Sequence, residues 1–237
     1  MRLYCLPYAG ASASVYTSFE HQLTGQGIQC KAIEYPGHGS RMPEPLCRNI
    51  SDLAVDIIHN VTASEDEFCL YGHSLGGHVA YEVARNLQQK NNTSLKHLFL
   101  SGNASPSVPI KFSGLHKLPL EHLFEKLSEL GGILNPETWD EDAQQLFLPI
   151  LQADFEIVSS ITYKRGLPLN VPITAFIGTE DIYSLSEVQQ WQYETKFSLA
   201  AYQFKGNHFF PFDHIKEIVG IISRKIHDTA IMTTVAE

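Results

Sequence analysis

Basic side chains, cysteines and long apolar runs are all scarce in this sequence. Its 17 lysines and arginines stand against 26 aspartates and glutamates, so the formal net charge is -9 at pH 7. Nucleic acids and anionic membranes are bound through clustered basic side chains, so this balance argues against both as partners. No stretch approaches the ~20 apolar residues of a membrane span, and the N-terminus lacks a charged segment followed by an apolar one. We therefore expect a soluble, cytoplasmic protein.

The sequence also lacks the patterns of a disulfide framework or a metal site. It has four cysteines and no C-x-x-C pair, which predicts buried free thiols in a reducing compartment. The histidines are scattered without zinc-ligand spacing, so we expect no metal and no other bound cofactor. Hydrophobic residues make up 43% of the 237 residues, enough for the core of a single large domain spanning residues 1–237.

Short apolar runs alternate with helix-period segments along the chain. This alternation predicts an α/β fold, with a mostly parallel central sheet flanked by helices. The expected strands cover residues 3–6, 28–35, 68–72, 97–101, 173–178 and 200–204. The expected helices cover residues 14–23, 51–61, 75–89, 184–193 and 212–226. The tail after Asp228 is expected to be frayed.

The alternation stops between about residues 106 and 168. Two helical patterns follow each other there, "LPLEHLFEKLSELGG" and "WDEDAQQLFLPILQADFEIVSSITY". Because a helical insertion in an α/β sheet often covers the active site, we expect a lid. Pro149 lies inside the second pattern and should kink or divide that helix, since proline removes a backbone hydrogen bond.

One serine stands at a corner between an expected strand and an expected helix. The segment from Gly72 to Gly76, "GHSLG", matches G-x-S-x-G, in which glycines permit a strained turn that exposes the serine hydroxyl. Ser74 is therefore the candidate nucleophile, and the alternative is an ordinary helix N-cap. The neighbouring histidines, His73 and His78, are poorly placed to act as its base, and we interpret them as packing or polar-network residues.

The general base and its acidic partner should follow the serine in the order Ser, Asp or Glu, His, on loops after later strands. His208 follows the expected strand 200–204 and is the candidate base, with His214 as the weaker alternative. In the turn "GTED", Asp181 is preferred over Glu180 because a short, stiff carboxylate can turn back toward the imidazole.

These residues predict an acyl-enzyme mechanism. His208 would accept the Ser74 proton, Asp181 would hold the imidazole, and water would release the acyl group. The oxyanion would bind the backbone N–H of Leu75 and a second one from the small-residue loop after the first strand, from Tyr8 or Ala9.

Several stretches taken together resemble the stand-alone type II thioesterases of nonribosomal peptide and polyketide assembly lines. The similarity runs from residue 3 to about residue 226 and rests on "LPYAGASAS", "YPGHGSRMPEP", "GHSLGG", "GTED", "GNHFF" and "LFLPILQADFEIVSSITY". It implies an α/β-hydrolase fold, with Ser74, Asp181 and His208 at the triad positions. The family usually has two glycines where this chain has Gly10-Ala11, and often an arginine at His38, which leaves a role for that position open.

The resemblance also implies a substrate class and a partner. The expected substrates are acyl, aminoacyl or peptidyl thioesters on the phosphopantetheine arm of acyl or peptidyl carrier proteins, and we expect the enzyme to be a monomer. Carrier proteins are usually acidic, so docking should use a local basic or apolar patch, for which Lys111, Lys117 and Arg41 are candidates. The alternatives are a general carboxylesterase or lipase, a hydrolase-fold protein that binds without turnover, and release of a product by cyclisation.

Overall fold

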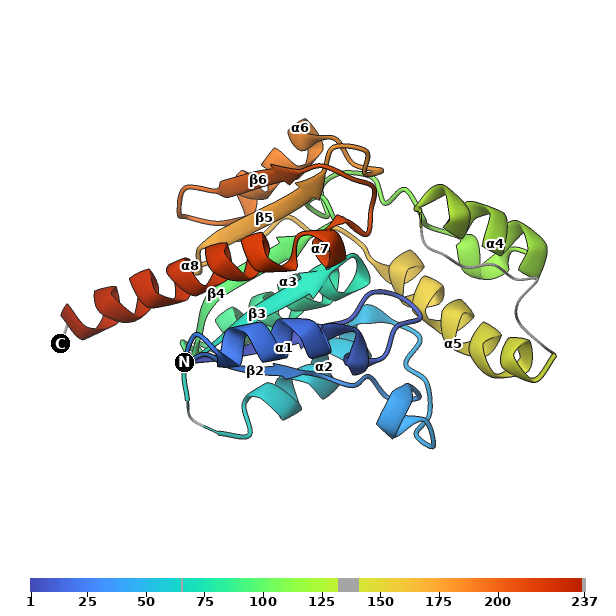
Figure 1. The fold of residues 1–237 in the computed structure, drawn as a ribbon, viewed down its shortest axis with the longest axis horizontal. Helices are drawn as coiled ribbons and strands as arrows, with labels where there is room; N and C mark the ends of the chain where they lie inside the picture. Colours follow the sequence, from blue (N-terminus) through green and yellow to red (C-terminus); the bar gives the residue numbers. More distant parts are fainter. Residues whose placement is uncertain (65, 132–140, 236–237) are drawn as a thin grey trace.

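The structure is a computed structural model that describes residues 1–64, 66–131 and 141–235. Its centre is a six-stranded, fully parallel sheet with the strand order β2-β1-β3-β4-β5-β6 (Figure 1). The strands are β1 (Arg2–Leu6), β2 (Gln29–Ala32), β3 (Phe68–His73), β4 (Leu95–Ser101), β5 (Ile173–Gly178) and β6 (Ala200–Phe204). This confirms the predicted α/β fold and all six predicted strands.

Helices cover both faces of the sheet, because alternate side chains of each strand point to opposite sides. On one face, Tyr4 and Leu6 of β1 belong to the core with α2 (Ile50–Val61) and α3 (Leu75–Gln89). On the other face, Leu3 and Cys5 belong to the core with α1 (Thr17–Thr24) and α8 (Ile215–Val235). The remaining helices are α4 (Leu120–Glu129), α5 (Glu141–Ser160), α6 (Leu185–Val188) and α7 (Phe210–Asp213).

Differences from the predicted elements lie mainly at the periphery. The edge strand β2 ends at Ala32, short of residue 35. The segments 14–23 and 184–193 are each split between an α-helix and a 3₁₀ turn. The predicted helix at 212–226 is two helices, which meet at the non-helical residue His214. The expectation of a frayed tail after Asp228 is wrong, because α8 continues to Val235 (Figure 1).

The two helices of the expected lid segment lie beyond the carboxyl ends of the strands, apart from the layers that cover the sheet (Figure 1). Pro149 does not divide α5, which is one helix of 20 residues. The residues that follow Pro149 are held by burial, since Leu151 and Phe155 belong to the main core and are each 5% exposed. Tertiary packing therefore outweighs the backbone hydrogen bond that proline removes.

The first turn of α3 packs directly on the end of β1, and this close approach depends on Gly76. A methyl group at Gly76 would collide with the backbone carbonyl of Leu6, which cannot move without displacing the sheet. A methyl group on Gly220 in α8 would meet nothing nearer than an Arg224 side-chain nitrogen at 3.8 Å. The two glycines are thus a matched pair of helical positions, one crowded and one open.

We predict that Gly76→Ala lowers the free energy of unfolding by about 2 kcal/mol or more, because of the backbone collision. We predict that Gly220→Ala raises it by about 0.5 to 1 kcal/mol, since alanine is the better helix former. Urea unfolding followed by circular dichroism measures both. Equal effects of the two substitutions would contradict the close packing of α3 on β1.

Candidate active site

Ser74 occupies a strained corner between β3 and α3. Its backbone angles are φ 54° and ψ -117°, and a positive φ is costly for a residue with a side chain. Its N–H donates to the carbonyl of Ser101 at 2.8 Å, which fixes the corner against β4. A Cβ atom at Gly72 would collide with the backbone of Gly76, so the turn requires glycine there. The Ser74 side chain makes no capping hydrogen bond to α3, which argues against the N-cap interpretation.

His208 and Asp181 form a buried pair on the loops that follow β6 and β5. Nδ1 of His208 lies 2.8 Å from Oδ1 of Asp181, and the two side chains are 3% and 0% exposed. The Glu180 N–H donates to the Gly206 carbonyl at 2.9 Å, which ties the two loops together. A carboxylate cannot donate, so Nδ1 must carry the proton and Nε2 is left as an acceptor.

Neither alternative for this pair is supported. Glu180 is exposed, and it is Asp181 that contacts the imidazole. His214 instead places Nε2 2.9 Å from the carbonyl of Lys205.

Ser74 and His208 line the same cavity, whose volume is about 580 Å³. Its wall is largely apolar, and the segment expected to be a lid supplies part of it. Its apolar lining includes Leu127 and Leu130 near α4, and Phe147, Leu151, Phe155 and Val158 on α5. Such a cavity is large enough for an acyl chain and is shielded from water on the side of α4 and α5.

The loop after β1 lies along this cavity and offers two free backbone donors. The Gly10 N–H donates to Oδ2 of Asp154 at 2.6 Å, and the Ala11 N–H donates to the Tyr8 carbonyl at 3.1 Å. Within the described residues, the N–H groups of Tyr8 and Ala9 have no acceptor, and both residues line the cavity. Leu75, the first residue of α3, lines the cavity as well and has the free N–H of a helix N-terminus.

Asp154 also receives a hydrogen bond from His38, and we call these two residues with Gly10 the latch. Nε2 of His38 lies 3.1 Å from Oδ2 of Asp154, and Nδ1 lies 3.0 Å from the Pro36 carbonyl. Both ring nitrogens face acceptors, so both contacts are made only when the ring is protonated. Burial lowers the pKa of His38, but the hydrogen bond and charge of Asp154 outweigh it and hold that pKa above its ordinary value.

Sequence reasoning did not find Asp154. The residue lies in the largely apolar pattern "LPILQADFEIV" of α5, two positions before Glu156, and it is 1% exposed in the structure. A carboxylate buried this deeply needs partners, and the signal in the sequence was an acidic side chain among apolar residues. Its partners are 116 and 144 residues away along the chain, so that no local pattern could name them.

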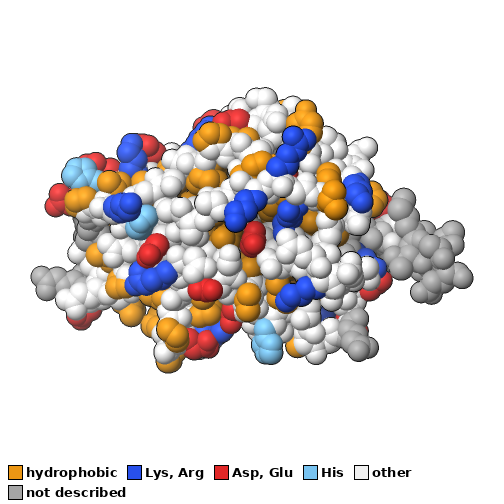
Figure 2. Space-filling model, turned by 180° about the vertical axis from the view of Figure 1, so that it is seen from behind, with side chains coloured by type: hydrophobic (Ala, Val, Ile, Leu, Met, Phe, Trp, Pro, Cys, Tyr) orange, Lys and Arg blue, Asp and Glu red, His pale blue; other side chains and the backbone are white. Residues whose placement is uncertain are grey.

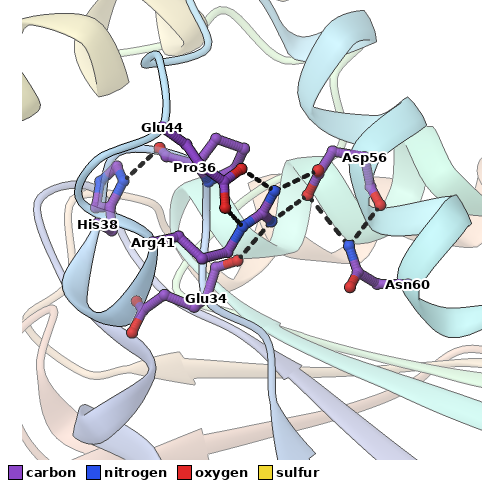
Figure 3. Close-up of polar contacts among 7 residues, drawn as sticks. All are labelled: Glu34, Pro36, His38, Arg41, Glu44, Asp56 and Asn60. Atoms are coloured by element: carbon purple, nitrogen blue, oxygen red, sulfur yellow. Dashed lines mark hydrogen bonds and ion pairs between the residues drawn. The ribbon is translucent and has the colours of Figure 1, made fainter.

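Basic side chains do not form a single patch on the face drawn in Figure 2, where lysines and arginines are interspersed with acidic residues. Arg41, a candidate for docking, contacts Asp56 at 2.7 Å and Glu44 at 2.6 Å, and its side chain points away from His38 (Figure 3). Lys111 is paired with Glu187 at 2.9 Å. Arg41 and Lys111, two of the three docking candidates, are therefore engaged in intramolecular ion pairs.

The two histidines beside Ser74 differ in their surroundings. His73 packs against His208, with ring centroids 4.9 Å apart, and Nδ1 lies 3.1 Å from the Ser101 hydroxyl. Burial and the neighbouring His208 ring lower the pKa of His73 well below its usual range. His78 is 5% exposed and lines the cavity, which the sequence interpretation did not predict.

Neither a metal centre nor a membrane span is found in the described part of the chain. No group of three or more histidine, cysteine, aspartate or glutamate side chains there is arranged to hold a metal ion. No helix in residues 1–64, 66–131 and 141–235 combines the length and the apolar character needed to cross a membrane.

Similarity to known proteins agrees with this architecture. Gramicidin S biosynthesis protein GrsT of Aneurinibacillus migulanus is 30% identical over 228 residues, covering 95% of this chain and 89% of that protein. The structure of the RedJ thioesterase from the prodiginine pathway of Streptomyces coelicolor is 28% identical, with a TM-score of 0.86, covering 94% of this chain and 84% of that one. The structure of the type II thioesterase BorB from the borrelidin biosynthetic cluster is 29% identical, with a TM-score of 0.80, covering 94% and 91%.

These similarities extend over the sheet, both helical layers and the loops that hold Ser74, Asp181 and His208. The sheet is that of the α/β-hydrolase fold, as in these relatives. The family model for the thioesterase domain matches residues 1–226. The chain therefore belongs to the thioesterase family.

Proposed function

We propose that the enzyme hydrolyses acyl, aminoacyl or peptidyl thioesters carried on the phosphopantetheine arms of carrier proteins, and so clears stalled groups from a biosynthetic assembly line. The observation that carries the proposal is that Ser74 and His208 line one cavity, and that His208 is paired with Asp181. The relatives support a role in a biosynthetic assembly line. GrsT is a gramicidin S biosynthesis protein, and BorB is a type II thioesterase of a borrelidin cluster.

The proposed chemistry assigns a role to each of the three side chains. Oγ of Ser74 attacks the thioester carbonyl while its proton passes to Nε2 of His208, which Asp181 orients through Nδ1. The C–S bond then breaks, and the leaving sulfur takes that proton. A water molecule, deprotonated by His208, attacks the acyl-serine and releases the free acid. Thiolates leave readily, so this triad and an oxyanion hole suffice.

The oxyanion hole would consist of the Leu75 N–H and one from Tyr8 or Ala9. The latch supports this assignment, because Asp154 fixes Gly10, the next residue along the loop. Through Gly10, the latch connects this loop, whose residues Tyr8 and Ala9 line the cavity, to α5. In this proposal the segment containing α4 and α5 is the lid, and it both shapes the acyl cavity and steadies the oxyanion loop.

We predict that Ser74→Ala lowers kcat/KM for an acyl carrier protein thioester by about a thousandfold or more, because no acyl-enzyme can form. Thiol release measures the rate, and intact mass detects the acyl adduct. Ser198→Ala, at an exposed serine outside the cavity, is the control that should keep full activity.

The same assay separates thioesterase from esterase. A thioester and an oxygen ester of the same acyl group are offered side by side, and we expect faster turnover of the thioester. Turnover by Ser74→Ala at the wild-type rate would refute the nucleophile, and a strong preference for the oxygen ester would favour a carboxylesterase.

We predict that the latch makes stability depend on pH. The folded pKa of His38 lies above its ordinary value of 6.5, so the contribution is complete below about 6.5 and is lost as the pH rises through the folded pKa. At pH 6 the wild type should exceed His38→Gln by about 1 to 3 kcal/mol in free energy of unfolding, and the difference should shrink toward pH 9.

Urea unfolding at several pH values measures this difference. Asp154→Asn removes the charge that raises the His38 pKa, so it should abolish the same pH-dependent component. A stability difference that stays constant from pH 6 to pH 9 would show that His38 does not titrate in this way.

A further inference from the structure

Two buried tyrosines hold consecutive backbone carbonyls where β1 ends. The Tyr16 hydroxyl donates to the Leu6 carbonyl at 3.0 Å. The Tyr35 hydroxyl donates to the Pro7 carbonyl at 2.9 Å. Tyr16 is 0% exposed and belongs to the core with α1 and α8, whereas Tyr35 is 1% exposed and belongs to the core with α2 and α3. The two peptide groups that lead into the loop after β1 are therefore held by side chains from both layers.

These two peptide groups differ in what lies opposite the carbonyl. The described residues contain no cis peptide bond, and in a trans peptide group the N–H points away from the carbonyl. The peptide between Leu6 and Pro7 has no N–H, because proline lacks it. In the next peptide, the group opposite the held carbonyl is the Tyr8 N–H, which has no acceptor within the described residues. The Tyr35 bond thus sets the direction of a free donor, and the Tyr16 bond does not.

The Pro7 carbonyl points into the packed interior. Besides its bond to Tyr35, it lies against the first turn of α3, since a methyl group at Gly76 would come within 2.7 Å of its oxygen. The opposed Tyr8 N–H therefore points out of this interior. Tyr8 lines the cavity that Ser74 lines, whereas Pro7 and Tyr35 do not.

The other free donor of the loop, the Ala9 N–H, is oriented by a different contact. The carbonyl opposite it is that of Tyr8, which accepts from the Ala11 N–H at 3.1 Å within the loop itself. The direction of the Ala9 N–H thus depends on a turn of the loop, while that of the Tyr8 N–H depends on a buried side chain. Catalysis by hydrogen-bond donors relies on their being held in place beforehand, which favours Tyr8.

The hydroxyl of Tyr35 is itself fixed and stays protonated. The Tyr35 ring packs edge-on against the His38 ring, with centroids 5.8 Å apart, and the Tyr35 carbonyl accepts from the His38 N–H at 3.1 Å. Burial and the charge of Asp154 raise the pKa of Tyr35 well above its ordinary value. The hydroxyl is therefore a neutral donor at pH 7.

We propose that Tyr35 is a positioning residue for the oxyanion hole: by holding the Pro7 carbonyl, it directs the Tyr8 N–H at the oxyanion that forms on the thioester. This inference rests on the proposed function and selects Tyr8 over Ala9 as the second donor, beside Leu75. Tyr35 touches no substrate. Its hydrogen bond affects the rate because the oxyanion exists only in the transition state and the tetrahedral intermediate.

Tyr35→Phe removes only the hydroxyl, and hydrolysis of hexanoyl-pantetheine measures the effect. Loss of a whole oxyanion donor costs about a hundredfold or more in kcat, and for a donor that is only misdirected we expect a loss of about tenfold or more. KM should stay within about twofold of its wild-type value, because the ground state does not use this donor.

Tyr16→Phe is the matched control. It removes an equally buried hydroxyl from the preceding carbonyl, opposite which there is no N–H. We expect its kcat to stay within about twofold of the wild type, although both variants lose the stability of one buried hydrogen bond, about 1 kcal/mol.

A transition-state analogue separates positioning from general loosening of the loop. In a hexyl trifluoromethyl ketone, Oγ of Ser74 adds to the carbonyl carbon, the serine proton passes to Nε2 of His208, and the ketone oxygen becomes an oxyanion. Tyr35→Phe should weaken this adduct by the factor it takes from kcat/KM. The hexyl thioether of pantetheine, which has no carbonyl, should bind Tyr35→Phe as it binds the wild type.

The wild type provides a test that needs no variant to fold. Nuclear magnetic resonance of isotope-labelled enzyme reports each backbone amide before and after the ketone adduct forms. The amide proton that bonds to the oxyanion should move downfield, and we expect this for Tyr8 and not for Ala9.

Three results would overturn the inference. They are an equal loss of kcat in Tyr35→Phe and Tyr16→Phe, an unchanged affinity of Tyr35→Phe for the ketone, and a downfield shift at Ala9 in place of Tyr8. In each case a wild type that hydrolyses the thioester and forms the adduct leaves the proposed function standing. A wild type that does neither removes the proposed function, and the inference falls with it.

Discussion

The positive φ of Ser74 is the constraint on which the rest of the site depends. A φ of 54° is unfavourable for serine, and the fold must hold it in place. It does so with the hydrogen bond from Ser74 to Ser101 and with the close packing of Gly76 on the end of β1. Because β3 lies between β1 and β4, the same contacts that hold the corner place the loop after β1 beside it. The order of the strands therefore fixes the positions of Ser74 and of this loop together.

The sequence predicted the elements and residues whose causes are local. The buried central strands and helix α3 have strong periodicity and glycine-marked ends, and α3 was placed at its observed bounds. The loops holding Asp181 and His208 followed from strand order alone. The preference for Asp181 over Glu180 is decided by the structure, since neighbouring residues in a turn point in different directions. The latch could not be predicted from the sequence, because His38 and Asp154 lie 116 residues apart and a single sequence does not show which distant residues are in contact.

Helix α5 joins two different environments at Pro149. Before the proline, Leu146 and Phe147 are 45% and 38% exposed, although Phe147 also lines the cavity. After it, Asp154 is held by His38 and Gly10, and Phe155 is buried in the core. Proline removes the backbone hydrogen bond that would otherwise couple the two halves most tightly. The half that contacts the loop after β1 is thus held by hydrogen bonds of Asp154 and by burial, while Leu146 and Phe147 of the first half are exposed.

The candidate catalytic side chains and the apolar wall of the cavity belong to different parts of the structure. The candidate catalytic side chains lie at the ends of the strands, where the sheet and the buried hydrogen bond between His208 and Asp181 hold them. Helices α3 and α5 both supply side chains to the wall of the cavity. The groups at the ends of the strands and the apolar wall of the cavity are therefore held by different contacts of the fold.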